Sequence, residues 1–193
     1  LLATQKDKLS NPLSDFMTNI LVPGQYSWME RKGLLMCPYF ETTGDTPEQG
    51  LQGFNDGPRY SSGHAALFNR IGIIRESHML KPYADSVNAT LQLLLGTLAV
   101  MNGHHVQLRE ARAAAKRTTA EATEFGLNWR LDTSVVGELP WKGYAVRRET
   151  SKVTGLPRIR YDRSAPSETR VPWRDKYRPS LMVPKPKAWI VPQ

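Results

Sequence analysis

The short apolar run from Ile71 to Ile74 constrains the fold more than any other part of the sequence. A continuous run of this kind is typical of a strand that other elements cover on both faces. Helix signals lie on both sides of it, because Ser61 or Ser62 can cap a short helix before it and a long helical pattern follows it. This alternation of helices and strands favours an α/β layer architecture.

The first 60 residues predict several shorter elements. Ser10 can cap a helix with Pro12 in its first turn, and Pro23-Gly24 is expected to interrupt or end that helix. Residues 34–37 have the pattern of a short buried strand, which the following proline stops. The glycine-rich stretch 41–58 is expected to form a long loop, and loops of that length are usually functional or disordered.

A long helical stretch is predicted from about Pro82 to Glu124, with weak points at Gly96 and at residues 101–103. Its apolar residues recur at helical spacing at Val87, Leu91, Leu94, Leu95 and Leu98. Residues 107–124 are rich in alanine and in charged residues, which indicates a solvated helix whose basic cluster is an exposed face rather than a binding patch. The basic cluster consists of Arg109, Arg112, Lys116 and Arg117.

The last third of the chain changes character. Strand-like alternation occurs at residues 129–132, 144–148 and 158–161, and prolines accumulate from Pro166 onward. We expect a small antiparallel β appendage there, with one more short strand at residues 188–191. The sequence therefore predicts two parts: a main domain over residues 1–125, and an incomplete β-rich, proline-rich appendage over residues 126–193.

Charge, cysteine content and hydropathy limit the partners that we expect. The formal charge is +8, but the basic residues gather mostly after Arg109, and we do not expect a nucleic-acid partner. Cys37 is the only cysteine, which excludes an intramolecular disulfide and a cysteine-built zinc site. The longest apolar stretches, such as residues 91–95, are too short to cross a bilayer, so we expect no membrane partner.

Glu76 is the first candidate for a functional residue. It ends the predicted buried strand, and α/β sheets place their ligand crevices beyond the strand ends, which suits a general base or acid. Glu76 and His78 would share one face of a strand, and His64 could approach them to complete a two-histidine, one-carboxylate metal site. We favour the simpler interpretation, in which His64 is a polar pocket residue and His78 lies at the surface. Cys37 is expected to be a small buried hydrophobe rather than a nucleophile.

A family resemblance rests on residues 58–81. They combine a Tyr60-Ser61-Ser62-Gly63 turn, a helix, and a strand that ends in Arg75-Glu76-Ser77-His78. This segment resembles the last catalytic segment of the carboxypeptidase A-like zinc peptidases, above all of their large bacterial members. Residues 3–9 are similar to the sequence just after the family's third zinc ligand. The resemblance implies that the chain is the C-terminal part of a mixed-sheet carboxypeptidase-like domain, which the long helix closes.

The resemblance also implies roles for single residues. Glu76 matches the glutamate that activates the zinc-bound water and passes its proton to the leaving amine, and Tyr60 falls near a mobile tyrosine that covers the substrate. The zinc ligands of the family, a His-x-x-Glu pair and a later histidine, are expected upstream of Leu1, and no His-x-x-Glu occurs in this sequence. Zinc, a peptide or peptide-like substrate and an exported or periplasmic location are therefore expectations for the parent protein. The chain by itself is expected to hold no metal and to be inactive.

The alternative is a non-catalytic binding or structural module, which would use the basic helix and the proline-rich tail to hold another chain. Part of an α/β domain also leaves apolar faces and a sheet edge uncovered. We therefore expect the chain to self-associate or to contact the missing N-terminal part.

Overall fold

A computed structural model of the chain describes residues 1–188. Helices account for 38% and strands for 32% of the chain, and parallel and antiparallel pairing both occur, which confirms the α/β class. The chain forms two compact units that alternate along the sequence. The first comprises residues 1–40, 53–132 and 175 onward, and the second comprises residues 41–52 and 133–174.

A nearly continuous helical segment opens the first unit. It consists of α1 (Asn11–Phe16), one π-helical stretch η2 (Met17–Leu21) and α2 (Val22–Arg31). The prediction that Pro23-Gly24 ends this helix is wrong, because Pro23 lies in the first turn of α2, where a missing N–H costs least. The helix ends instead at Arg31, and Gly33 just beyond it has a φ of +68°, which is readily adopted only by glycine.

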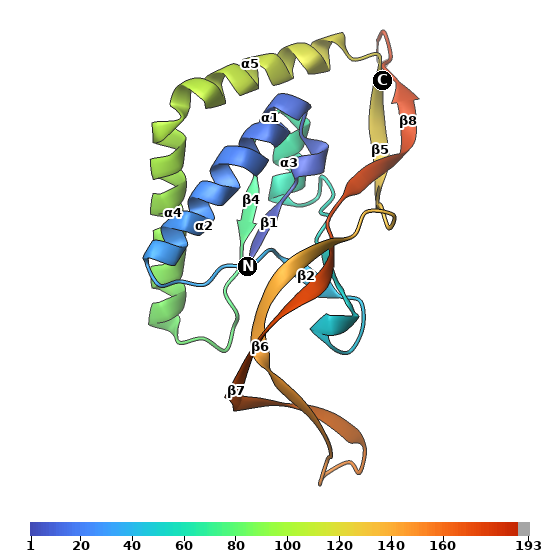
Figure 1. The fold of residues 1–193 in the computed structure, drawn as a ribbon. Helices are drawn as coiled ribbons and strands as arrows, with labels where there is room; N and C mark the ends of the chain where they lie inside the picture. The colour runs from blue at the N-terminus through green and yellow to red at the C-terminus, as the bar shows by residue number, and fades with distance from the viewer. Residues whose placement is uncertain (189–193) are drawn as a thin grey trace, which may run out of the picture. The chain divides into compact units, whose positions relative to one another are not determined.

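Two further helices cover this segment (Figure 1). They are α4 (Tyr83–Gly103) and α5 (His105–Glu121), and the non-helical φ of −119° at His104 breaks the predicted single helix close to its expected weak point. The α2 helix packs on α4, where Gly96 leaves room for the Trp28 ring. The α1 helix packs on α5, where the buried core side chains are Leu9, Leu13, Met17 and Ala115.

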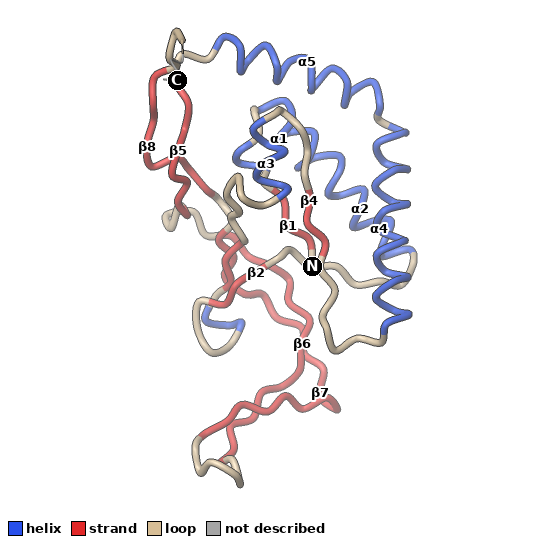
Figure 2. Tube along the Cα trace, turned by 180° about the vertical axis from the view of Figure 1, so that it is seen from behind, coloured by secondary structure: helices blue, strands red, loops and turns tan. Residues whose placement is uncertain are grey.

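Two small antiparallel sheets complete the first unit (Figure 2). One pairs β1 (Leu2–Thr4) with β4 (Ile73–Arg75), and the other pairs β5 (Glu124–Leu131) with β8 (Tyr177–Pro184). The predicted strand is therefore present at β4, but within residues 1–188 it has β1 as its only partner and is not a central strand. The predicted strand at residues 34–37 is wrong, since that segment joins β1 only through an isolated bridge between Leu2 and Pro38.

The second unit is a four-stranded mixed sheet in the order β2-β3-β7-β6. Its long hairpin joins β6 (Gly137–Thr150) to β7 (Pro157–Arg174) in antiparallel register, with a bulge between residues 144 and 145. The short strands β2 (Phe40–Thr42) and β3 (Leu51–Gly53) flank a 3-10 turn η3 (Pro47–Gln49), and β3 runs parallel to β7. The stretch predicted as a long loop thus contains three short elements.

The antiparallel strands expected after residue 126 are present, but they are divided between the two units. The division of the chain into residues 1–125 and 126–193 stays a prediction. The strand expected at residues 188–191 falls almost wholly outside the described residues. By length and composition α4 meets the criteria for a membrane span, so the expectation that every apolar segment is too short is wrong for this helix. One such helix is weak evidence for a span.

Asp7 joins the start of the first unit to its last strand. Its side chain is only 8% exposed, and it accepts hydrogen bonds from the Lys176 ammonium at 2.8 Å and from the Tyr177 amide at 2.8 Å. Lys6 adds a third contact at 3.1 Å from η1 (Lys6–Lys8). Burial acts to raise the pKa of Asp7, but these donors outweigh it and hold the pKa below its ordinary value.

Replacing Asp7 with Asn should lower the free energy of unfolding at pH 7 by about 1–3 kcal/mol, because charge-assisted hydrogen bonds are lost. Since the pKa of Asp7 is lower in the folded chain, this stabilisation is complete above the ordinary carboxyl pKa of 3.8 and disappears as the pH falls through the folded value. Urea unfolding of the wild type between pH 3 and pH 7 should therefore be steeper in pH than that of Asp7→Asn. Asp15→Asn, at an exposed carboxylate of α1, is the control, and an equal effect of the two changes would contradict the prediction.

Candidate active site

Glu76 directly follows β4 and remains attached to β1 through its backbone. Its amide donates to the Leu1 carbonyl at 3.1 Å, and its own carbonyl accepts from the Leu1 amino group at 2.8 Å. The backbone of Glu76 is thereby held in place, whereas its side chain is exposed. The carboxylate thus lies at the surface of the chain, although the strand before it was expected to be buried. The position at a strand end is as expected.

The structure does not bring His64, Glu76 and His78 together as metal ligands. Within residues 1–188 no group of three or more His, Cys, Asp or Glu side chains gathers closely enough to hold a metal ion. The Nδ1 atom of His78 accepts from the Leu80 amide at 3.2 Å, so His78 closes a local turn. His64 lies exposed on α3 (Ser61–Leu67), with its ring 5.0 Å from that of Phe68.

Tyr60 is the residue that precedes α3, and it is partly exposed. Its ring meets the ring of Phe54 edge-on, with 5.5 Å between the centroids and an interplanar angle of 89°. Phe54 also contacts Tyr39 at 5.1 Å, which makes a row of three aromatic rings. Edge-to-face contacts of this kind contribute about 0.5–1.5 kcal/mol beyond area burial. Tyr60 is thus anchored on one side, while its other side faces solvent.

Asp56 fixes the turn that leads to Tyr60, and the sequence analysis missed it. It is fully buried, and its Oδ2 accepts from the Ser62 hydroxyl and from the Gly63 amide, the latter at 3.2 Å. Its backbone carbonyl accepts from the Lys8 ammonium, whose pKa burial lowers in spite of the nearby Asp56 charge. An aspartate a few residues before a Ser-Gly helix start was the available signal, since such side chains often accept from helix N-termini.

Two glycines allow the backbone around this turn to pack closely. A Cβ on Gly63 would lie 2.2 Å from the carbonyl oxygen of Gly57. A Cβ on Gly72, just before β4, would lie 2.6 Å from the Cα of Ser62. Residues 56–63 and the start of β4 are therefore held against each other by backbone contacts, which fixes the approach to Glu76.

Cys37 behaves as a structural residue. It is partly buried, and burial raises the pKa of its thiol, opposed by the nearby Leu1 amino group and Lys81. A raised pKa keeps the thiol protonated and unreactive at neutral pH. This agrees with the expectation of a small hydrophobe rather than a nucleophile.

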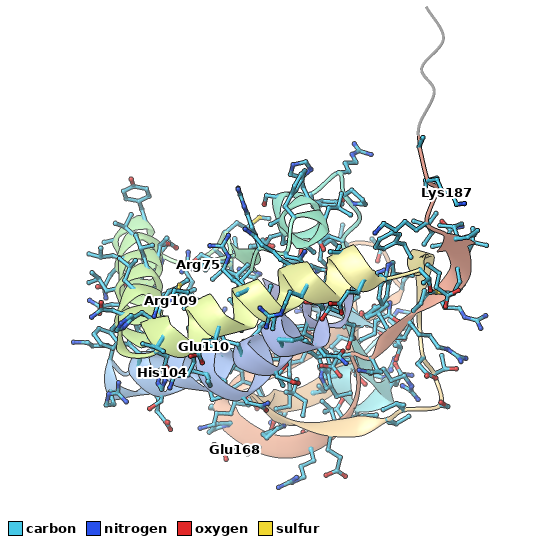
Figure 3. The ribbon with its side chains drawn as sticks, turned by 90° about the horizontal axis from the view of Figure 1, so that it is seen from above. Arg75, His104, Arg109, Glu110, Glu168 and Lys187 are labelled. Atoms are coloured by element: carbon cyan, nitrogen blue, oxygen red, sulfur yellow. The ribbon has the colours of Figure 1, made fainter. Side chains whose placement is uncertain are left out.

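The basic cluster of α5 is exposed, as expected for a solvated face; Figure 3 shows Arg109 beside Glu110 on this helix. In the second unit, a hollow of about 540 Å³ opens on the β6–β7 hairpin. Two ion pairs line it, since Arg147 pairs with Asp162 at 2.7 Å and Arg160 lies 3.7 Å from Glu149, and Arg163 adds a further positive charge. Hydrogen bonds from Ser164, and then the nearby arginines, lower the pKa of Asp162.

Comparison with models of protein families, with curated proteins and with solved structures found no match to this chain. The carboxypeptidase resemblance therefore rests on residues 3–9 and 58–81 alone.

Proposed function

We propose that the chain is the C-terminal part of a carboxypeptidase-like hydrolase, in which Glu76 serves as general base and then general acid in peptide hydrolysis. The observation that carries the proposal is the place of Glu76 immediately after a strand, with its backbone held and its carboxylate exposed. Within residues 1–188 this carboxylate forms no ion pair with a side chain.

The local order of elements also supports this proposal. A turn at Tyr60, the helix α3 and the strand β4 follow one another, as the resemblance implies. Tyr60, on the partly exposed aromatic row, is proposed as a substrate contact.

Zinc is implied by the resemblance, but residues 1–188 do not fit a zinc site by themselves, because no ligand group gathers among them. We assign no metal ligand in this chain. The chemistry that we assign to Glu76 is proton transfer alone: it takes a proton from the attacking water and delivers it to the leaving amine as the C–N bond breaks. Both transfers require hydrogen-bond reach to the reacting atoms.

Glu76→Gln in the full-length parent protein should test this role. The amide keeps the shape of the side chain but cannot accept the proton, so kcat for peptide hydrolysis should fall by about 10²–10⁴-fold. Substrate binding should change little, because the variant removes only the proton transfer. Glu30→Gln, at an exposed glutamate of α2, is the matched control. Unchanged turnover in Glu76→Gln would remove Glu76 from the mechanism and favour the non-catalytic binding module.

A further inference from the structure

The turn of the β6–β7 hairpin carries two large apolar side chains that lie in solvent. Val153 is 93% exposed and Leu156 is 65% exposed. In Figures 1 and 2 this turn lies at the opposite end of the hairpin from β2 and β3, the other strands of the second unit. Exposed apolar surface that polar residues surround often marks an interaction site for a protein or a membrane.

Local hydrogen bonds fix the conformation of this turn. The Ser151 hydroxyl accepts from the amides of Val153 and Thr154 at 3.3 and 3.2 Å. The Ser151 carbonyl accepts from the Gly155 amide at 2.9 Å, and the Ser151 amide donates to the Leu156 carbonyl at 2.9 Å. Gly155 has a φ of +69°, which glycine adopts readily. The two apolar residues are therefore held in their exposed positions before a partner binds, which lowers the entropic cost of binding.

Basic residues crowd the strands directly behind the turn. Residues 147–163 contain six basic and two acidic side chains, which leaves a net charge of +4. Both acidic side chains already form ion pairs, Glu149 with Arg158 and Asp162 with Arg147. Three basic residues of this segment form no ion pair within residues 1–188: Arg148, Lys152 and Arg163. The end of the hairpin therefore carries positive charge that the chain itself does not neutralise.

The apolar and basic side chains follow one another in a definite order along the hairpin. Lys152 is next to Val153, and Arg158 follows Leu156 by two residues, about 7 Å along an extended strand. Segments that bind in the interface of a bilayer bury their apolar side chains about 5–10 Å deep, at the boundary of the headgroups and the acyl chains. With the two apolar side chains at that depth, Lys152 and Arg158 would lie level with the headgroup phosphates.

We propose that the turn of the β6–β7 hairpin binds the surface of a bilayer that contains anionic phospholipids. Val153 and Leu156 enter the edge of the acyl region, and the basic residues behind them bind headgroup phosphates. A bilayer has a negative surface above an apolar interior, in the order in which the hairpin presents its side chains. A nucleic acid exposes its phosphates but offers apolar surface only between unstacked bases. This attachment involves one leaflet and requires no membrane span.

Co-flotation of the 193-residue chain with vesicles tests this binding, because flotation excludes protein that has only aggregated. Phosphatidylcholine vesicles with about 30% phosphatidylserine should bind the chain at least about tenfold more tightly than phosphatidylcholine alone, since each basic residue near an anionic surface strengthens binding about fivefold. Salt screens exposed charges, so binding should weaken between about 0.1 M and 0.5 M NaCl. Lys152→Glu should weaken binding to the anionic vesicles at least about fivefold, and Val153→Ser combined with Leu156→Ser at least about tenfold.

Two control variants make the same chemical changes outside the hairpin. Lys116→Glu reverses an exposed charge of α5, and Met79→Ser combined with Leu80→Ser removes an exposed apolar pair before α4. Both controls should bind within about twofold of the wild type, because charges beyond the screening length contribute little. All the substituted side chains are exposed, so circular dichroism should show an unchanged fold.

Four results would overturn the proposal. The first is no flotation with the anionic vesicles, and the second is equal binding to the two kinds of vesicle, which would exclude a role for the charges. The third is equal flotation of the hairpin variants and the wild type, which would assign lipid binding to another surface. The fourth is binding of a random-sequence DNA duplex that Lys152→Glu abolishes, without binding to vesicles, which would assign the basic residues to a nucleic acid.

Discussion

Gly63→Ala is expected to destabilise the first unit by about 2–4 kcal/mol, because the new methyl group would require backbone movement. The added Cβ would lie 2.2 Å from the carbonyl oxygen of Gly57 and 2.7 Å from its carbonyl carbon. Flexible side chains can rotate away from such a contact, but two segments of backbone cannot. The turn before α3 would have to open, and the Gly63 amide would move away from the buried Asp56 carboxylate to which it donates at 3.2 Å.

Gly57→Ala is the matched control for this change. It lies at the same turn, but a Cβ there would meet nothing within 4 Å, and its φ is not in the left-handed region. We expect Gly57→Ala to change the free energy of unfolding by less than about 0.5 kcal/mol, as is usual for substitutions away from packed features. Urea unfolding followed by tryptophan fluorescence measures both variants. Equal stability of Gly63→Ala and Gly57→Ala would show that the two backbone segments are not held together.

The second large effect is expected at Asp56. Asp56→Ala removes the acceptor of two buried donors, the Ser62 hydroxyl and the Gly63 amide. Each buried donor left without a partner costs about 1–3 kcal/mol, so the loss should reach about 2–6 kcal/mol in total. The measurement is again the urea midpoint at constant m-value, which separates a change in stability from a change in the unfolded state.

Two further variants make the Asp56 result specific. Asp56→Asn keeps one side-chain oxygen that can accept a hydrogen bond, so its loss should be smaller than that of Asp56→Ala. Asp15→Ala removes an exposed carboxylate of α1 and should have little effect. A loss below about 0.5 kcal/mol for Asp56→Ala would contradict the role of this carboxylate in holding the turn.

Elements with a local signal could be predicted from the sequence. The helix after Ser61, the strand that ends before Glu76 and the strand-like alternation of the last third all depend on neighbouring residues. The break near residue 104 was also predictable, because Asn102 and Gly103 are poor helix formers. The exposed basic face of α5 followed from its composition.

Features that depend on distant residues could not be predicted. Pro23 does not stop the first helix, because the π-helical stretch ends just before it and Pro23 lies in the first turn of α2. The packing of α2 on α4 stabilises the helix beyond the proline. Residues 34–37 have a strand-like composition, but they form no ladder with β1, whose one bridge in this region is to Pro38. Asp56 is buried because the Ser62 hydroxyl and the Gly63 amide donate to its carboxylate. The exposure of the Glu76 side chain depends on tertiary packing around β4, which the local sequence does not specify.

The order in which the two units use the chain has a consequence for how the protein folds. Asp7, near the start of the sequence, accepts hydrogen bonds from Lys176 and Tyr177. Strand β3 pairs with Trp173 and Arg174 of β7. Neither unit can be completed during synthesis until residues 173–177 have emerged. Until then Asp7 is without two of its donors. The turn end of the β6–β7 hairpin pairs residues close in sequence, such as Thr150 with Pro157, and can form early. Long-range closure rather than hairpin formation should therefore set the folding rate.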